Sequence, residues 1–481
     1  MSEVSLLKQL TRSLMAGLPI ANQDPHRQKW HVMPAIGALN DPNGFIQAHG
    51  RYHLFHQWNP LTCGTGASWW AHLSSTDLVT WQHEPVALLP TEDYEINGCY
   101  SGSAVLKDDK IHLLYTGNVK FKDGSRTAWQ CLAIEQADGT YEKRGPVIAL
   151  PEGYTGHVRD PKVWQHDDFW YMVLAAQAPD LQGKILLYRS PDLTQWELLN
   201  ELAGSCVNQL SEFGYMWECP DLFRLENADI LLCCPQGLAA KEYEYLNLYQ
   251  AGYFIGELDY QTHRYQHGSF HEMDLGFEFY APQTTETEDG RRLMFGWLGL
   301  PDDNRFAQPT VQYGWVDCLT CPRELIYRDG QLYQTPVSEL KALRSTHELS
   351  WSGLAENAPA LDAMSSELHV DVSAPFSLSF RENASLKWDG QQLIFTRLNW
   401  RTQQEESRYW FGELDHLQIL LDASSIEIFI NHGEACMSAR YFPSVQKKKM
   451  EFDGAHPVSI RHWLLHSPML ECPQPTSPEV P

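Results

Sequence analysis

The chain has 481 residues, and its 61 acidic side chains outnumber its 36 basic ones, giving a formal net charge of −25. A field of that sign repels phosphate backbones and anionic lipid, so we expect neither nucleic acid nor a membrane as a partner. No run of about 18 apolar residues occurs, so no membrane-spanning helix is predicted. The length is typical of two or three domains, and we expect two.

The first predicted element is a helical segment over residues 1–25. Leu6, Leu10 and Leu14 recur at helical spacing and would form an apolar stripe. Lys8 interrupts the continuous apolar stretch that a signal peptide requires. We therefore expect an N-terminal helix and no export signal.

The cysteines are scattered along the chain. There are eleven of them, without the dense spacing of a secreted disulfide scaffold, which indicates free thiols and a cytoplasmic protein. Cys318 and Cys321 form a CxxC pair, but no second pair follows at ligand spacing, so buried thiols are favoured over a zinc site. We expect no metal and no cofactor.

A short block of polar residues, often with proline, recurs about every sixty residues. The five blocks begin at Asp41, Ser101, Asp160, Glu218 and Tyr280, with separations of 60, 59, 58 and 62 residues. Each block is followed by a segment rich in aromatic and aliphatic residues, which indicates a strand. Because a single blade cannot bury both of its faces, five such repeats predict a five-bladed β-propeller over residues 26–325.

The pattern changes after the fifth repeat. Residues 326–349 are expected to form a linker with a short helix, and alternating apolar positions over 350–472 predict a β-sandwich. The segment 473–481 is rich in proline and is expected to be disordered. The predicted fold class is therefore all-β, a propeller followed by a sandwich.

The repeat register also predicts where polar side chains meet. If each block opens the innermost strand of its blade, Asp41, Ser101, Asp160 and Glu218 all lie at one mouth of the central channel. The alternative is that these acids cap unrelated surface turns, since Asp-Pro and Asn-Gly are ordinary turn pairs. The constant spacing favours convergence.

Carboxylates gathered in one pocket cannot all remain ionised, so their roles must divide. Glycoside hydrolysis uses such a division between a nucleophile and a protonated acid. Asp41 has Asn40 and Asn43 beside it, which would hold it ionised as the nucleophile, whereas Glu218 has uncharged neighbours and is expected to have a raised pKa and to act as the acid.

Asp160 has a different expected role. It follows Arg159, whose charge would keep it ionised and ready to accept hydrogen bonds from sugar hydroxyls; the alternative is a purely local ion pair. Aromatic side chains near the channel could stack on sugar faces. The tryptophans in suitable positions are Trp58, Trp69, Trp70, Trp217 and Trp297.

Three motifs carry a resemblance to a known family: the runs 40–44 (Asn-Asp-Pro-Asn-Gly), 159–161 (Arg-Asp-Pro) and 218–220 (Glu-Cys-Pro). In this order they resemble glycoside hydrolase family 32, which contains invertases, fructanases and bacterial sucrose-6-phosphate hydrolases. The resemblance implies a retaining β-fructofuranosidase without a cofactor, with a fructosyl-enzyme on Asp41, Glu218 as acid and then base, and Asp160 as transition-state stabiliser.

The same resemblance suggests the substrates and further site residues. Sucrose, sucrose 6-phosphate or short fructo-oligosaccharides would be the substrate, and the choice between free and phosphorylated sucrose stays open. Cys219 is expected to modulate the pKa of the neighbouring glutamate. Sugar contacts are expected from Asn40, Gln57, Trp70, Tyr100, Ser101, Arg159, Tyr280 and Trp297.

Two positions depart from the family pattern. Ala38 stands where many members have a tryptophan before the first motif, and Thr65 lies near the position of another family tryptophan. These changes point to remodelled pocket walls. A fructosyltransferase on the same site, an inverting glycosidase and a non-catalytic carbohydrate-binding propeller are the alternatives.

Overall fold

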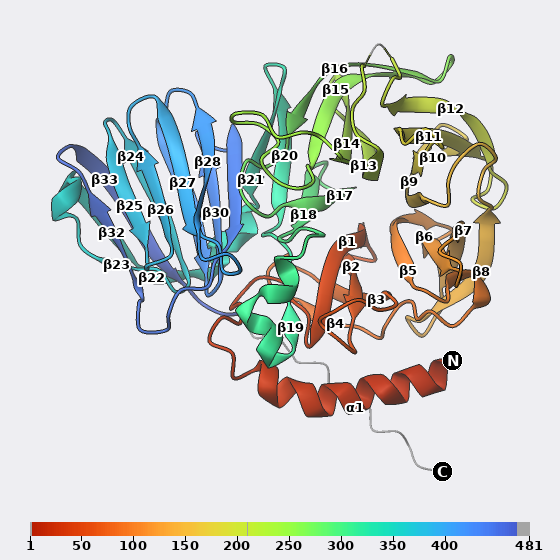
Figure 1. Ribbon diagram of the computed structural model, residues 1–481, viewed down its shortest axis with the longest axis horizontal. Helices are drawn as coiled ribbons and strands as arrows, with labels where there is room; N and C mark the ends of the chain where they lie inside the picture. The colour runs from red at the N-terminus through yellow and green to blue at the C-terminus, as the bar shows by residue number, and fades with distance from the viewer. Residues whose placement is uncertain (1, 209, 469–481) are drawn as a thin grey trace.

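The computed structural model describes residues 2–208 and 210–468 and is almost entirely β-structure. Five sheets form a ring, and a two-layered sandwich stands beside it (Figure 1). This confirms the predicted all-β class with a propeller and a C-terminal sandwich. Each inner strand carries one of the five sequence blocks, so the sixty-residue repeat corresponds to the blades.

The blades follow one another in chain order, each an antiparallel sheet. The first contains β1 (Gly37–Ala48), β2 (Arg51–Asn59), β3 (Trp69–Ser75) and β4 (Gln82–His83). The second contains β5 (Cys99–Lys107), β6 (Lys110–Lys120), β7 (Arg126–Glu135) and β8 (Tyr141–Ile148). The third contains β9 (Val158–His166), β10 (Phe169–Gln177), β11 (Gly183–Ser190) and β12 (Glu197–Gly204).

The fourth and fifth blades complete the ring. The fourth contains β13 (Met216–Leu225), β14 (Ala228–Gln236), β15 (Gly252–Asp259) and β16 (Arg264–Glu272). The fifth contains β17 (Tyr280–Glu286), β18 (Arg292–Trp297), β20 (Arg323–Arg328) and β21 (Gln331–Pro336). Its outer hairpin β20–β21 had been expected in the linker, so the boundary predicted at residue 325 falls inside the blade.

The segment between β18 and β20 closes the ring. It includes the 3-10 turns η2 (Arg305–Ala307) and η3 (Pro309–Tyr313) and the strand β19 (Trp315–Val316). Strand β19 pairs in parallel with β1, joining the end of the propeller to its beginning. A third 3-10 turn, η4 (Ser338–Leu343), takes the place of the short helix expected in the linker.

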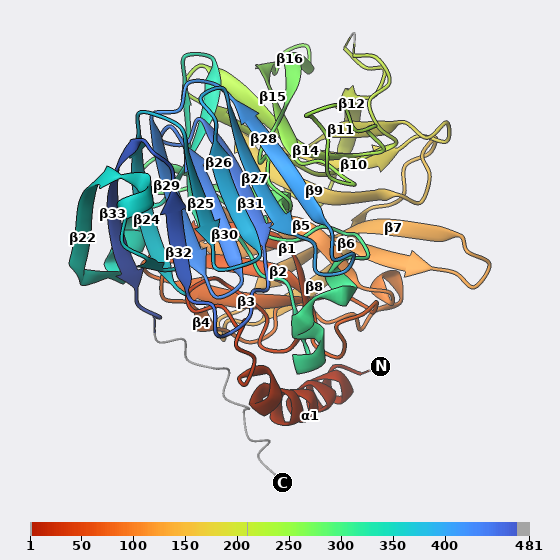
Figure 2. The ribbon, with the colours of Figure 1, turned by 60° about the vertical axis from the view of Figure 1, so that its left-hand side comes forward.

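Two six-stranded sheets form the sandwich, and Figure 2 shows them face to face. One contains β22 (Arg344–Leu354), β33 (Pro457–Leu465), β24 (Ser366–Val372), β29 (His416–Asp422), β30 (Ser425–Ile430) and β31 (Ala435–Arg440). The other contains β23 (Leu361–Asp362), β32 (Lys449–Asp453), β25 (Phe376–Phe380), β26 (Ala384–Trp388), β27 (Gln392–Leu398) and β28 (Glu405–Phe411).

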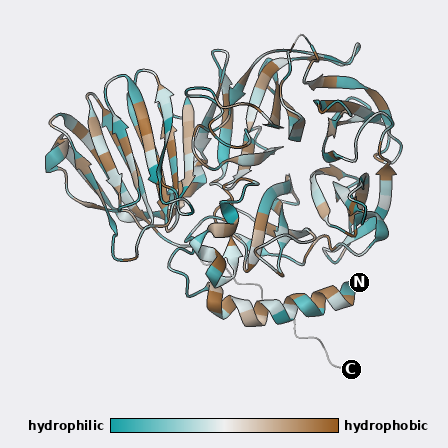
Figure 3. Cartoon of the chain, in the orientation of Figure 1, coloured by the Kyte–Doolittle hydropathy of each residue, from teal (hydrophilic) through white to brown (hydrophobic). Residues whose placement is uncertain are grey.

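Alternation explains the sandwich core. Buried and more exposed positions alternate along β25 and β27, so one side of each strand faces the core. Figure 3 shows the apolar residues along the strands of the sandwich. The first strand begins at Arg344, six residues before the predicted start at 350. The 3-10 turns η1 (Asp93–Glu95) and η5 (Ala355–Asn357) complete the elements. The predicted tail 473–481 and the last residues assigned to the sandwich, 469–472, lie outside the described residues.

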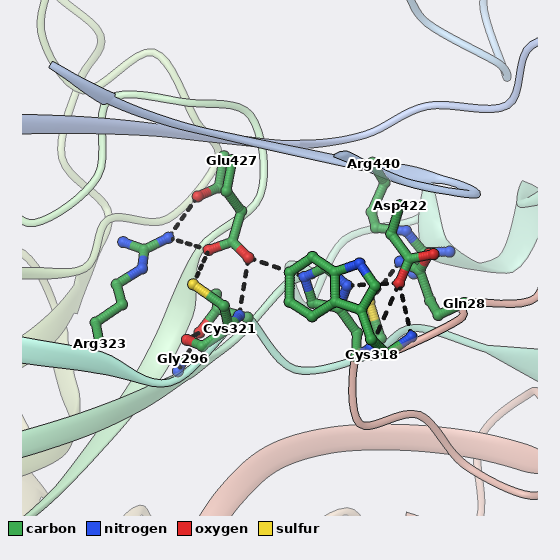
Figure 4. A network of polar contacts seen from close by, with 12 residues as sticks. Gln28, Gly296, Cys318, Cys321, Arg323, Asp422, Glu427 and Arg440 are labelled. Atoms are coloured by element: carbon green, nitrogen blue, oxygen red, sulfur yellow. Dashed lines mark hydrogen bonds and ion pairs between the residues drawn. The ribbon is translucent and has the colours of Figure 1, made fainter. Parts of the chain in front are cut away.

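A buried polar network holds the sandwich against the propeller (Figure 4). Asp422 accepts hydrogen bonds from the backbone N–H groups of Lys29, at 2.8 Å, and Trp30, at 3.1 Å. Glu427 accepts from Arg323 Nη2 at 2.7 Å and contacts His31 Nε2 at 2.9 Å. Because these charges are fully buried, each depends on its partner across the junction.

The N-terminal helix α1 (Glu3–Ala21) packs on the first blade. Ser2 caps it, and the predicted stripe Leu6, Leu10 and Leu14 is buried in a cluster with Trp58 and Trp69. Within the part of the chain that the structure describes, no helix is long and apolar enough to cross a membrane.

Candidate active site

The inner strand of every blade is irregular at the position of its sequence block. Ladder pairing shifts within the blocks of all five inner strands, β1, β5, β9, β13 and β17. Cys219 and Ala281 have φ of 50° and 48°, a left-handed conformation that is costly for these residue types, and Asp160 has φ of 67°. Such bulges turn side chains out of the normal alternation. They direct the block residues toward the channel mouth.

A cavity of about 290 Å³ lies at this mouth. Asp41 from β1, Asp160 from β9 and Glu218 from β13 line it together. Of the residues expected to contact sugar, Asn40, Gln57, Tyr100, Arg159, Tyr280 and Trp297 also line it. The structure therefore brings carboxylates from three blades into one pocket.

Asp41 is half-buried and is hydrogen-bonded to the second blade. Ser101 Oγ donates a hydrogen bond of 2.5 Å to its Oδ2 atom. Burial raises the pKa of Asp41 to about 6, although the Ser101 hydrogen bond and the Arg305 charge oppose the rise. The expectation that neighbouring amides keep Asp41 ionised is corrected, since Asn40 Oδ1 instead accepts from Arg305 Nη2 at 2.9 Å.

Glu218 is surrounded by hydrogen-bond donors. Its Oε1 atom accepts from Arg159 Nε at 2.9 Å and Nη2 at 2.6 Å. Its Oε2 atom accepts from the Tyr280 hydroxyl and from Gln236 Nε2, each at 2.7 Å. Burial alone would raise the pKa of Glu218, but the Arg159 charge and these hydrogen bonds outweigh it and lower the pKa. The expected rise is therefore wrong for the free protein.

Asp160 has few compensating donors. Its Oδ2 atom accepts from the Cys219 N–H at 3.0 Å, while Arg159 Nε lies 4.0 Å away. Burial raises the pKa of Asp160 to about 7 despite the Arg159 charge. Sequence adjacency suggested that Arg159 keeps Asp160 ionised, but the guanidinium is directed at Glu218 on the neighbouring blade.

Three residues expected in the site have other surroundings than the sequence suggested. Trp70 is fully buried beneath the cavity and donates to the Tyr100 carbonyl at 3.0 Å, so it offers no face to a sugar. Ser101 lines a separate cavity of about 10 Å³ and positions Asp41 through its hydrogen bond. Cys219 Sγ lies 3.7 Å from Asp41 Oδ2 and from Asp160 Oδ2, so it contacts the two aspartates.

Sequence reasoning missed several residues of the site. Arg305 lines the cavity from η2, outside the repeat, where no motif marks it. Gln236 ends β14 opposite Met216, and the register of the fourth blade could have indicated its approach to Glu218. Lys120 lines the cavity from the end of β6. In the described ranges, no group of three His, Cys, Asp or Glu side chains is arranged to hold a metal.

Comparison with known families agrees with this geometry. The N-terminal domain of glycosyl hydrolases family 32 matches residues 31–336, and the C-terminal domain of the same family matches residues 339–461. The chain belongs to glycosyl hydrolase family 32. It is therefore a glycoside hydrolase, as the convergent carboxylates indicated.

Relatives of this family 32 hydrolase match it along nearly its whole length. It is 51% identical to a sucrose-6-phosphate hydrolase of Salmonella typhimurium, over 98% of this chain and 100% of the relative. It is 45% identical to a sucrose-6-phosphate hydrolase of Bacillus subtilis, over 92% of each chain.

Solved structures share the architecture of the family 32 hydrolase. The sucrose-6-phosphate hydrolase of Lactobacillus gasseri superposes with a TM-score of 0.87 at 30% identity, covering 95% of this chain and 97% of that one. A mutant β-fructofuranosidase of Bombyx mori in complex with sucrose gives 0.85 at 31% identity, covering 97% and 99%. The Bombyx mori structure thus holds sucrose in the same fold.

Proposed function

We propose that the chain is a retaining β-fructofuranosidase that releases fructose from sucrose or sucrose 6-phosphate. The convergence of Asp41, Asp160 and Glu218 from three blades on one sugar-sized cavity carries the proposal. The names of the relatives at 51% and 45% identity support this substrate class. We further propose a cytoplasmic location, which the free thiols of the described cysteines support.

The proposed reaction has two displacements. The Asp41 carboxylate attacks the anomeric carbon of the fructosyl unit, and Glu218 gives its proton to the glycosidic oxygen as the bond to glucose breaks. Water then attacks the fructosyl-enzyme ester while Glu218 takes the water proton, and Asp41 leaves as a carboxylate. Protons and charge are restored at the end of the cycle.

The hydrogen-bond donors around Glu218 stabilise its carboxylate after it has given up its proton. The reactive form needs a proton on Glu218 and none on Asp41, whereas in the free protein burial favours protons on the two aspartates. Once Glu218 has given up its proton, Arg159 and Tyr280 stabilise the carboxylate that forms. Interactions of this kind act on the transition state more than on the bound substrate.

Asp160 is proposed to bind the fructosyl unit. Its carboxylate lies in the same cavity and accepts one backbone hydrogen bond from Cys219, which leaves acceptor positions for sugar hydroxyls. Hydrogen bonds to hydroxyls that become more acidic in the oxocarbenium-like transition state would strengthen as the reaction proceeds.

Transfer of fructose to a second sugar is the competing function. Ala38 and Thr65 line the cavity, so small side chains form part of its wall and leave room for an acceptor. The ratio of free fructose to oligosaccharide at high sucrose concentration separates the two reactions. Predominant oligosaccharide would identify a transferase.

The test compares fructose release by the wild type with that of Asp41→Asn, Asp160→Asn and Glu218→Gln. Each variant is expected to lose several orders of magnitude in kcat, because each removes a group that acts in the transition state. Glu257→Gln, at an exposed carboxylate on β15, is the matched control and should keep full activity. Near-normal turnover by Asp41→Asn would overturn the proposed nucleophile.

A further inference from the structure

Positive charge is concentrated at one edge of the cavity, in a chain whose formal net charge is −25. Lys120 ends β6 and Arg126 begins β7, and the two residues face each other in the strand register. Arg126 and Arg159 both donate to His157 Nδ1, at 3.1 Å each, which links them into one group. We name Lys120, Arg126 and Arg159 the cationic rim.

The three cations of the rim differ in how their charge is compensated. Arg159 is paired with Glu218 at 2.6 Å. Arg126 donates to two neutral acceptors, His157 Nδ1 at 3.1 Å and Asn118 Oδ1 at 2.6 Å, and its buried Nε atom has no partner. Among the residues that the structure describes, neither Lys120 nor Arg126 has a carboxylate within ion-pair distance. The rim therefore carries excess positive charge.

His157 adds no charge of its own but fixes the geometry. Arginine cannot accept a hydrogen bond, so His157 Nδ1 must be the acceptor for both guanidinium groups and its proton is on Nε2. Burial and the charges of Arg159 and Arg126 lower the pKa of His157 to about 4. The imidazole stays neutral at physiological pH and holds the two arginines side by side.

The position of the rim indicates which part of a substrate it meets. Glu218 delivers its proton to the leaving oxygen, so the leaving sugar lies on the Glu218 side of the cavity, and the rim borders that side through Arg159. Near Asp41 the cavity has Arg305 instead, whose charge is paired with Asp317 at 2.9 Å. Of the two rim cations without a carboxylate partner, Lys120 lines the cavity itself.

Lys120 is the member of the rim that is both exposed and part of the cavity lining. A lysine ammonium on a flexible stem is a common ligand for phosphate, which carries about −1.5 to −2 charges at neutral pH. Arg126, opposite Lys120 in the strand register, adds longer-range attraction. Glucose 6-phosphate is the leaving group that matches this chemistry.

We propose that Lys120 binds the phosphate of sucrose 6-phosphate, with Arg126 strengthening the local positive field, and that the phosphorylated disaccharide is therefore the preferred substrate. This inference rests on the proposed β-fructofuranosidase function and deepens it. In this proposal the cationic rim discriminates between sucrose 6-phosphate and sucrose, whereas the three carboxylates act in the same way on both.

The experiment measures kcat/KM for sucrose 6-phosphate and for sucrose, side by side, in the wild type and in Lys120→Gln. The wild type should prefer sucrose 6-phosphate. The ratio of the two values should fall about 10-fold to 100-fold in Lys120→Gln, as expected for loss of a charge-assisted contact. Lys120→Arg should keep most of the preference, because the charge is retained.

Lys122 offers the matched control, since it is exposed on the same β6–β7 loop and does not line the cavity. Lys122→Gln should leave the ratio unchanged. Equal wild-type values for the two substrates, or a ratio that Lys120→Gln does not change, would overturn the inference and leave the proposed function intact. Absence of fructose release from both substrates would instead refute the proposed function, and this inference with it.

Discussion

Arg159 and Glu218 come from neighbouring blades and are joined by two hydrogen bonds to the same carboxylate oxygen, 2.9 Å from Nε and 2.6 Å from Nη2. The other oxygen accepts from Tyr280 and Gln236. Protonation of Glu218 requires one of these donors to turn away. The Tyr280 hydroxyl can rotate and accept the new proton, whereas a guanidinium cannot. Tyr280 is therefore the partner suited to both states of the glutamate.

Replacement Tyr280→Phe tests this role. Its hydroxyl donates to ionised Glu218 and favours that form, so its removal should raise the pKa of Glu218 and keep the acid protonated to higher pH. The basic limb of the kcat/KM profile for fructose release should move up by about one pH unit. At the optimum, kcat should fall about tenfold, because the carboxylate formed by proton transfer loses a donor.

Tyr249→Phe is the matched control for Tyr280→Phe. The Tyr249 hydroxyl accepts a hydrogen bond from that of Tyr215 at 3.3 Å and has no hydrogen bond to Glu218. Its removal should leave the basic limb in place. A Tyr280→Phe profile with an unmoved or lowered basic limb would show that the hydroxyl does not govern the titration of Glu218.

Ser101→Ala should affect the opposite limb. The 2.5 Å hydrogen bond from Ser101 favours ionised Asp41, whose pKa burial raises to about 6. Without this donor the pKa of Asp41 should rise further, and the acid limb of kcat/KM should move to higher pH by about one unit. As the pH is lowered below neutrality, the variant would therefore lose activity at a higher pH than the wild type.

Ser103→Ala provides the comparison for Ser101→Ala. Ser103 lies on the same strand and accepts a backbone hydrogen bond from Val163 at 3.1 Å, without contact to Asp41. Ser103→Ala should lower the stability of the protein and leave the acid and basic limbs of kcat/KM unchanged. If Ser103→Ala and Ser101→Ala shift the acid limb equally, the effect comes from disturbance of β5 and not from the hydroxyl beside Asp41.

The blade register could be predicted because the sequence repeats it. The spacing of the blocks places Asp41, Asp160 and Glu218 at equivalent positions of successive inner strands, and a ring of blades directs equivalent positions to one axis. Chain order and the alternating strands of the sandwich follow from local patterns in the same way. These are features that each repeat encodes within itself.

Contacts between blades could not be predicted from the sequence. The nearest carboxylate to Arg159 in the sequence is Asp160, but the bulge in β9 turns the two side chains apart and sends the guanidinium to Glu218. Arg305 lies in η2, in the segment between β18 and β20 that closes the ring, and this segment has no counterpart in the other repeats. Protonation therefore had to be judged from the three-dimensional arrangement, and the expectations for Asp41 and Glu218 failed on that account.

Trp70 illustrates the same limit and yields a third prediction. Its indole is buried and donates to the Tyr100 carbonyl, so Trp70→Phe should leave that carbonyl unsatisfied and lower stability by about 1 to 3 kcal/mol. KM for sucrose should change little, because the ring does not reach the cavity. Trp297→Phe, at a side chain that lines the cavity, should instead change KM. A large KM effect with unchanged thermal stability in Trp70→Phe would place the indole against the sugar.

The network at the propeller–sandwich junction makes stability depend on pH. Burial alone would raise the pKa of Glu427, but the charge of Arg323 and the contact with His31 outweigh it and lower the pKa to about 2, from 4.5 when unfolded. Ionised Glu427 therefore stabilises the fold above about pH 4.5, and this contribution is lost as the pH falls from about 4.5 to 2. The pKa of His31 is raised in the folded protein. Protonated His31 therefore stabilises the fold in acid, and this stabilisation is lost as the pH rises through the folded-state pKa.

Glu427→Gln should lower stability at pH 7 by about 3 to 5 kcal/mol, because it leaves the buried Arg323 with less compensating charge. The difference from the wild type should shrink as the pH is lowered through the window below 4.5, where the wild-type glutamate also becomes neutral. Chemical unfolding monitored at several pH values measures this difference. Glu413→Gln, at an exposed glutamate of the same sandwich, should show no such dependence. A difference that stays constant with pH would mean that Glu427 stabilises the junction through packing and not through its charge.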